Sequence, residues 1–122
     1  MQNSMIQSLQ VCKVPDYSGV DIDLPFVFTG RTDEEISLVC PTAFVPENTI
    51  MREDEWRVLR ICGELDFSMV GVLSRITKIL ADNRIGIFAI STYNTDYVLI
   101  KDYDYNKAME SLKASGYRFR DE

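Results

Sequence analysis

The sequence predicts an α+β fold in which strands and helices follow the order βαββαβ between residues 56 and 119. Two observations carry this prediction: apolar side chains recur every three or four residues in two segments, and short β-forming runs flank those segments. The first half, by contrast, shows only strand-like runs between loops that contain proline and glycine. We therefore expect one antiparallel sheet with two helices, a ferredoxin-like arrangement, preceded by a mostly β half.

The first helix is predicted between residues 69 and 82, after a strand at 56–61. Its apolar residues are separated by steps of three and four, which places them on one face of a helix. Asp66 or Ser68 can cap its start, and Asn83 can end it. The residues of this apolar stripe are Met69, Val72, Leu73, Ile76, Ile79 and Leu80.

A hairpin and a second helix are expected next. Residues 86–90 and 97–100 are apolar, β-forming runs on either side of a polar turn. Both runs are apolar on both alternating faces, which predicts that a second domain or chain covers the sheet. Asp104 is expected to cap the second helix and Gly116 to end it, before a closing strand at 117–119. The expected buried stripe of this helix is Tyr105, Ala108, Met109 and Leu112.

The first half is expected to lack most of the corresponding first helix. Strand-like runs occupy residues 9–14, 26–29 and 36–40, and the last two form a hairpin. Residues 15–25 are interrupted by prolines and a glycine, so a loop is expected there. Residues 41–54 resemble a connector because they contain two prolines and end in acidic residues.

The two halves show a weak internal repeat. A Thr, Thr and Asp triplet recurs after 63 residues, each time between two β-rich segments. Turns reuse Thr and Asp for local reasons, so the match alone proves little. Together with the two hairpins, it suggests a duplication with a degenerate first copy. The triplets are Thr29, Thr32, Asp33 and Thr92, Thr95, Asp96. The predicted domain bounds are residues 1–50 for the degenerate half and 56–122 for the second domain, with a linker at about 42–55.

Composition narrows the function. The 122 residues carry a formal net charge of −6, which disfavours nucleic acid and anionic membranes as partners. The absence of histidine removes Ser-His and Cys-His nucleophiles and the common histidine metal sites. Cys12, Cys40 and Cys62 lie in apolar runs without a CxxC pair, so we expect reduced, buried thiols in a cytoplasmic protein. We expect no signal peptide, no membrane span and no cofactor.

Three segments resemble the ACT domain family, the small ligand-binding modules of amino-acid metabolism. They are 31–41, 65–73 and 87–97, and with the order of elements they cover most of the chain from Leu9 to Tyr117. More narrowly, the chain is similar to bacterial tandem-ACT proteins related to the regulatory part of aspartate kinase. The resemblance implies a ferredoxin-like fold, side-by-side pairing of ACT units, amino-acid binding at the junction between units, and no catalysis by the module. The 122 residues contain no recognisable catalytic domain, so we expect any output to pass through a homodimer or a partner such as a metabolic enzyme.

The candidate binding site combines the start of the first helix with the hairpin. Unpaired N–H groups and the dipole at a helix start favour a carboxylate. Asp66 could accept hydrogen bonds from an ammonium group, and Gly71 leaves room for close approach. The neighbouring strand and the polar hairpin end offer main-chain edges and hydroxyls. The candidate ligand-binding residues are Asp66, Phe67, Ser68, Met69, Val70, Gly71, Phe88, Ala89, Ile90, Ser91, Thr92, Thr95 and Asp96.

Each candidate also has a purely structural interpretation. Asp66 is equally suited to capping a helix, and Gly71 to close helix packing. Phe67 and Phe88 suit a core, and the Thr and Asp residues of the hairpin suit a turn. The favoured hypothesis is a non-enzymatic regulatory protein that binds an amino acid; the alternative is a structural or interaction module with the same fold and no ligand.

Two further classes are disfavoured. An acyl-phosphate hydrolase of this fold would need an arginine in the loop after the first strand, and residues 63–71 contain none. An RNA-binding sheet would need a basic face studded with aromatic residues, which the acidic charge and the aliphatic strands do not provide.

Overall fold

The computed structural model describes residues 2–61 and 71–119. Its strands are β1 (Gln2–Lys13), β2 (Phe28–Arg31), β3 (Ile36–Pro41), β4 (Met51–Arg60), β5 (Ile87–Ser91) and β6 (Asp96–Lys101). Two α-helices, α1 (Val72–Asp82) and α2 (Tyr105–Ala114), and two 3-10 turns, η1 (Thr42–Phe44) and η2 (Asp102–Asp104), complete the described elements. The antiparallel sheet and the two helices confirm the predicted mixed α+β, ferredoxin-like fold.

The chain divides into two compact units. The N-terminal unit comprises Gln7–Trp56, and the C-terminal unit comprises Met1–Ile6 together with Arg57–Glu122. Within the N-terminal unit the strand order is β2-β3-β1-β4, and within the C-terminal unit it is β1-β4-β6-β5. Each unit therefore draws on both long strands, because β1 and β4 each contribute residues to both units.

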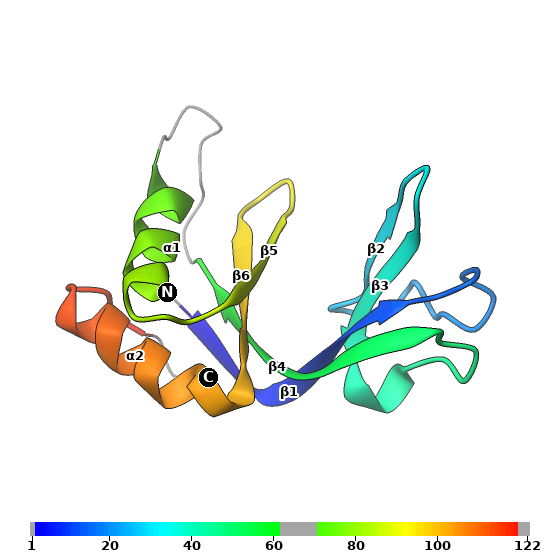
Figure 1. The fold of residues 1–122 in the computed structure, drawn as a ribbon, viewed down its shortest axis with the longest axis horizontal. Helices are drawn as coiled ribbons and strands as arrows, with labels where there is room; N and C mark the ends of the chain where they lie inside the picture. Colours follow the sequence, from blue (N-terminus) through cyan, green and yellow to red (C-terminus); the bar gives the residue numbers. More distant parts are fainter. Residues whose placement is uncertain (1, 62–70, 120–122) are drawn as a thin grey trace. The chain divides into compact units, whose positions relative to one another are not determined.

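In the C-terminal unit, α1 and α2 pack together on one face of the sheet (Figure 1). Leu59, Val98 and Ile100 supply the sheet side of this core. Five residues of the predicted α1 stripe are confirmed, because Ile76 and Leu80 are buried and Val72, Leu73 and Ile79 pack against the same core. The sixth, Met69, lies outside the described residues, and α1 begins at Val72, three residues later than predicted. All four stripe residues of α2 are buried: Tyr105, Ala108, Met109 and Leu112. The spacing of the apolar residues thus predicted which faces of the two helices are buried.

The helix ends match the predictions only in part. Asn83 follows α1, and Gly116, with φ +96°, follows the last turn of α2, as predicted. The predicted caps of α1 at Asp66 or Ser68 are wrong, because Gly71 is the N-cap and has a left-handed backbone with φ 85°. Asp104 is the N-cap of α2, but its side chain makes no capping hydrogen bond because η2 leads directly into the helix.

The predicted strand at residues 117–119 is wrong. These residues form no strand, although Tyr117 and Phe119 pack against the core beneath the helices. In the sheet, β4 lies between β1, the first strand of the chain, and β6. β4 also begins earlier than predicted, at Met51, so strand residues occupy the last part of the expected linker.

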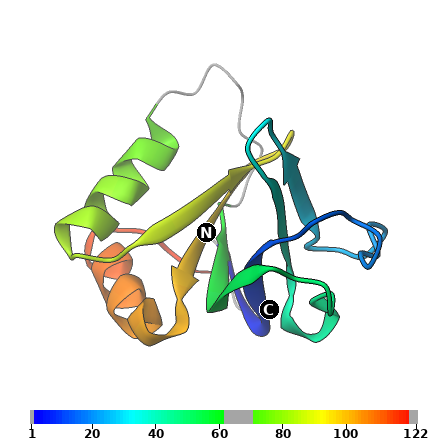
Figure 2. The ribbon, with the colours of Figure 1, turned by 45° about the vertical axis from the view of Figure 1, so that its right-hand side comes forward.

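The N-terminal unit contains strands and η1 but no α-helix between residues 8 and 56, as the sequence predicts. Its hairpin pairs β2 with β3, from Phe28 opposite Val39 to Arg31 opposite Ile36. Figure 2 brings this hairpin and the loop that precedes it forward. The core is small: Cys12, Val14, Leu38 and Cys40 are buried, and the loop side chains Tyr17, Val20 and Val27, together with Ile36 and Val45, pack against them.

The two units repeat one another with an offset of 60 residues, not the 63 that the sequence suggests. The last strand pair before the turn is Arg31 with Ile36 in one hairpin and Ser91 with Asp96 in the other. Each turn is closed by the same hydrogen bond, from Thr32 N to Glu35 O and from Thr92 N to Thr95 O, both 2.9 Å. The Thr-Thr-Asp match therefore paired residues that are not equivalent.

Candidate ligand-binding site at the hairpin of β5 and β6

The end of the β5–β6 hairpin gathers four of the predicted site residues. Ser91 and Asp96 face each other across the strands, and the Ser91 hydroxyl donates a 2.5 Å hydrogen bond to the Asp96 carboxylate. The Thr92 hydroxyl donates to the carbonyl of Thr95 at 3.1 Å. These polar groups bind one another, so their hydrogen bonds first of all shape the turn.

Thr95 also ties the hairpin to the end of β4. Its side chain is 8% exposed, and its hydroxyl donates a 2.6 Å hydrogen bond to the carbonyl of Ile61. The N–H of Ile61 donates in turn to the carbonyl of Asp96 at 3.1 Å. The hairpin end is therefore held beside the point where the chain leaves β4 toward α1. A buried hydroxyl that already donates to a carbonyl has a structural role at this position.

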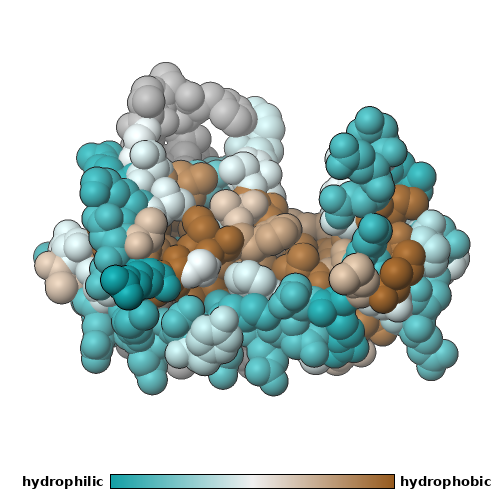
Figure 3. Space-filling view, in the orientation of Figure 1, coloured by the Kyte–Doolittle hydropathy of each residue, from teal (hydrophilic) through white to brown (hydrophobic). Residues whose placement is uncertain are grey.

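The predicted strand residues lie on β5, which is the outermost strand of its sheet. Phe88 and Ile90 are half-buried and face the side away from the helices, whereas Ala89 is exposed. Figure 3 shows hydrophobic surface over this hairpin. An outer strand has one row of backbone N–H and C=O groups without a strand partner, which is where another strand or a ligand backbone can pair.

Gly71 begins α1, and its carbonyl accepts hydrogen bonds from Arg75 twice, from the backbone N at 3.0 Å and from Nε at 3.3 Å. A Cβ built on Gly71 would meet nothing within 4 Å, so the positive φ, not crowding among the described residues, is what calls for glycine. The other predicted residues, Asp66, Phe67, Ser68, Met69 and Val70, lie outside the described residues.

Sequence reasoning missed Arg75. The Nε of its guanidinium donates to the carbonyl of Gly71, so this side chain folds back toward the first turn of α1. No acidic side chain lies in that turn, so the charge of Arg75 adds to the positive end of the helix dipole. The signal available in the sequence was an arginine four residues after the glycine that starts the helix.

Two buried thiols lie away from this site, in the N-terminal unit. Cys12 on β1 and Cys40 on β3 are 3% and 1% exposed and are hydrogen-bonded to each other. The hydrogen bond with Cys12 and the burial of the side chain both raise the pKa of the Cys40 thiol. Both cysteines are free thiols, as predicted.

Comparison with known protein families identifies the family of this chain. A sequence profile of the ACT domain family matches residues 51–114, more than half of the chain. The protein therefore belongs to the ACT domain family, whose members are in general regulatory domains that bind small molecules.

Solved structures share the fold over nearly the whole chain. A crystal structure of a protein from Agobacterium tumefaciens is 25% identical with a TM-score of 0.83, covering 93% of this chain and 87% of that one. A Vibrio cholerae protein of unknown function, described as a possible transport protein, is 17% identical with a TM-score of 0.72, covering 95% of this chain and 90% of that one.

The fold also recurs inside a larger enzyme. The aspartate kinase of Clostridium acetobutylicum, described as an allosteric enzyme, is 12% identical with a TM-score of 0.63. The match covers 90% of this chain and 32% of the kinase. No helix within the described residues is both long enough and apolar enough to cross a membrane.

Proposed function

We propose that this protein is a non-catalytic regulatory protein that binds a free amino acid between the start of α1 and the end of the β5–β6 hairpin. The observation that carries the proposal is the positive start of α1, where Arg75 folds back onto the carbonyl of Gly71 and no acidic residue lies in the first turn. A carboxylate is the group that such a helix start favours.

The remaining parts of an amino acid would meet the other predicted residues. Asp66 supplies the negative charge for the ammonium group. The side chain of the ligand would contact β5 at the exposed Ala89, which pairs with Val98 on the face of the sheet that carries the helices. Thr95 holds the end of the hairpin beside Ile61, the residue that directly follows β4, through the hydrogen bond between them.

The edge of β5 supports a second part of the proposal, a homodimer. Pairing of the β5 edges of two copies would continue the sheet and satisfy the outer backbone groups. It would also place residues of the second copy beside the site, as an amino-acid site at the junction of two units requires. A metabolic enzyme would then bind differently to the protein when the ligand changes the pairing of the two copies.

Binding is tested by a thermal-shift screen of the purified protein with each of the twenty amino acids. A ligand at a hundredfold excess over its Kd stabilises the folded state by about 2.7 kcal/mol. For the amino acid that shifts the melting temperature, calorimetric titration should show weaker binding to Asp66→Asn and Arg75→Gln. Asp82→Asn and Lys78→Gln make the same charge changes on the far part of α1 and should bind normally.

Two results would contradict the proposal. Flat melting curves with all twenty amino acids at millimolar concentration would favour the alternative, an interaction module without a ligand. Equal weakening by the site variants and their controls would show that overall charge, not the named side chains, governs binding.

The dimer is tested by light scattering of two variants at equivalent positions of the repeat. Ala89 on β5 and Thr29 on β2 are both exposed and lie on the two outermost strands. A lysine discourages edge pairing. Ala89→Lys should therefore yield monomers, and Thr29→Lys should leave the dimer unchanged. A dimer that survives Ala89→Lys would exclude the β5 edge as the interface.

A further inference from the structure

The N-terminal unit covers its sheet with loops where the C-terminal unit uses helices. Leu38 and Cys40 lie 60 positions before Val98 and Ile100, and all four are buried on the face that carries the core of their unit. In the C-terminal unit, α1 and α2 close over this face. In the N-terminal unit, residues 14–27 occupy the position of α1 in the order of elements, and residues 42–50 occupy that of α2. These two segments contain only turns and η1.

Between these two loop segments lies a pocket of about 520 Å³. This volume falls within the range of about 300–1,000 Å³ that is common for small-molecule sites. The pocket belongs entirely to the N-terminal unit and is unrelated to the site proposed at β5. It is lined by Ser18, Gly19, Asp21, Phe44, Val45, Pro46, Glu47 and Asn48.

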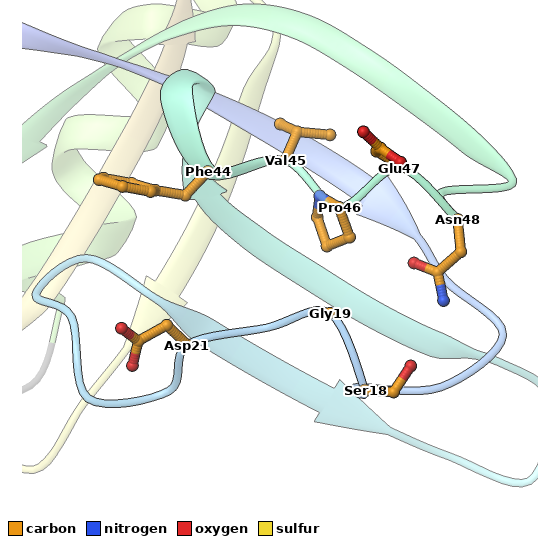
Figure 4. Close-up of a pocket in the computed structure, with 8 residues that line it drawn as sticks. All are labelled: Ser18, Gly19, Asp21, Phe44, Val45, Pro46, Glu47 and Asn48. Atoms are coloured by element: carbon orange, nitrogen blue, oxygen red, sulfur yellow. The ribbon is translucent and has the colours of Figure 1, made fainter.

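Gly19 and Pro46 form the tight side of the pocket (Figure 4). A Cβ on Gly19 would come within 3.1 Å of the Pro46 side chain and 3.6 Å of the Asn48 side-chain oxygen. Residue 19 is therefore a glycine because the two segments approach closely here. Asn48 reinforces this approach, since its amide donates to the carboxylate of Asp16 on the other segment at 3.4 Å. The Ser18 hydroxyl donates to the same carboxylate at 2.5 Å within its own segment.

The open side of the pocket pairs an aromatic ring with a carboxylate. Phe44 is 53% exposed although it is a large apolar side chain, and Asp21 lies across from it on the other segment (Figure 4). The face of an aromatic ring attracts a cation, and a carboxylate accepts its hydrogen bonds. Val45 and Pro46 provide apolar contact beside the ring.

The charged side chains that line the pocket have one sign. The lining residues include two acidic side chains, Asp21 and Glu47, and no Lys or Arg. Asp16 adds a third carboxylate, which accepts hydrogen bonds from the lining residues Ser18 and Asn48. The hydrogen bonds from Ser18, with a smaller contribution from the charge of Arg31, keep the pKa of Asp16 below the usual range. An anion would be repelled here, and a cation attracted.

We infer that this pocket binds a small organic cation, an amine with an apolar body, whose ammonium group lies between the Phe44 ring and the Asp21 carboxylate. The apolar body rests against Val45 and Pro46. The loss of the two helices from the N-terminal unit thus left a second ligand site where the C-terminal unit has a filled core.

The inference is tested by titrating the full-length, isotope-labelled protein with 2-phenylethylamine and following the backbone amide signals by NMR. We expect saturable shifts confined to the amides of residues 18–21 and 44–48. Two probes of matched shape, neutral 2-phenylethanol and anionic 3-phenylpropanoate, should give markedly smaller shifts at the same concentration. Raising the salt concentration should weaken the binding of the amine.

Variants separate the two recognition elements. Asp21→Asn and Phe44→Leu should each weaken binding of the amine by about two- to fivefold, the size expected for exposed ion-pair and cation–π contacts. Asp33→Asn and Ile22→Leu are matched controls at exposed residues that do not line the pocket, and they should bind as the parent does. The amide spectrum of each variant shows whether it is folded.

Three outcomes would overturn the inference. The first is an absence of saturable shifts with the amine. The second is an equal response to the amine, the alcohol and the carboxylate, because charge would then play no part. The third is equal binding by Asp21→Asn and Asp33→Asn in folded protein.

Discussion

The hydroxyl of Thr95 donates a 2.6 Å hydrogen bond to the carbonyl of Ile61, and this bond joins the β5–β6 hairpin to the end of β4. The two residues are 34 positions apart in the sequence, and both are buried. Because β4 ends at Arg60, this contact anchors the residue that directly follows the strand.

Replacing Thr95 with valine should destabilise the protein by about 1–3 kcal/mol, because it leaves a buried carbonyl without its donor. Thr95→Ser keeps the hydroxyl and should lose much less. Thr92→Val removes a hydroxyl that bonds only within the exposed turn and is the matched control. Urea denaturation measures the differences, and equal losses for Thr95→Val and Thr92→Val would contradict this role.

Arg57 stabilises the C-terminal unit mainly by stacking. Its guanidinium carbon lies 3.8 Å from the centre of the Tyr105 ring, and Nη1 lies 3.0 Å from a carboxylate oxygen of Asp102. The Asp102 side chain is 58% exposed, so water weakens this ion pair, whereas the Arg57 side chain is only 19% exposed.

We therefore expect Arg57→Gln to lower the melting temperature more than Asp102→Asn does. Arg57→Lys should fall between the parent and Arg57→Gln, because a lysine keeps the charge but loses the planar stack. Calorimetric melting of the three variants checks this order. A larger loss for Asp102→Asn would assign the stabilisation to the ion pair instead.

Gly71 and Gly86 both have room for a side chain, and comparing them tests the effect of backbone strain. Among the described residues, a Cβ on either Gly71 or Gly86 would meet nothing within 4 Å, and of the two only Gly71 has a positive φ, at 85°. Gly71→Ala should therefore destabilise the protein by about 1–2 kcal/mol through the left-handed backbone alone. Gly86→Ala should be neutral or slightly stabilising. Chemical denaturation of both variants separates strain from crowding.

The two thiols of the N-terminal unit should resist alkylation in the folded protein. Burial and the hydrogen bond between the two thiols raise the pKa of Cys40, so at pH 8 its thiol remains protonated. The same hydrogen bond lowers the pKa of Cys12, so the slow labelling of Cys12 rests on its burial, at 3% exposed. In a Cys62→Ser background, iodoacetamide should label Cys12 and Cys40 slowly in buffer and rapidly in denaturant. Mass spectrometry follows the labelling, and rapid modification of the folded protein would contradict the burial.

Much of the C-terminal unit could be read from local patterns. The buried faces of α1 and α2 followed from apolar spacing, because a helix repeats every 3.6 residues whatever surrounds it. The start of α1 could not be read in this way. Gly71 is the N-cap because its backbone has a positive φ, and no neighbouring residue in the sequence indicates that conformation. The prediction therefore favoured Asp66 or Ser68.

Only part of the candidate site could be predicted from the sequence. The sequence indicated the polar hairpin end, but it did not show that Thr95 already donates to Ile61 or that Arg75 folds onto Gly71. The pocket beside Phe44 had no sequence signal, because it arises where two loop segments meet across the face of a sheet.

The sequence by itself determined the α+β class, the two hairpins, the helical faces and the family, because all of these depend on local spacing and residue type. Tertiary structure decided that β4 lies between β1 and β6, and it left residues 117–119, for which the sequence predicted a strand, outside any strand. It also decided the true offset of the repeat, through the pairing of Arg31 with Ile36 and of Ser91 with Asp96. Strand pairing joins residues far apart in the chain, and the choice among competing partners rests on packing that no local pattern records.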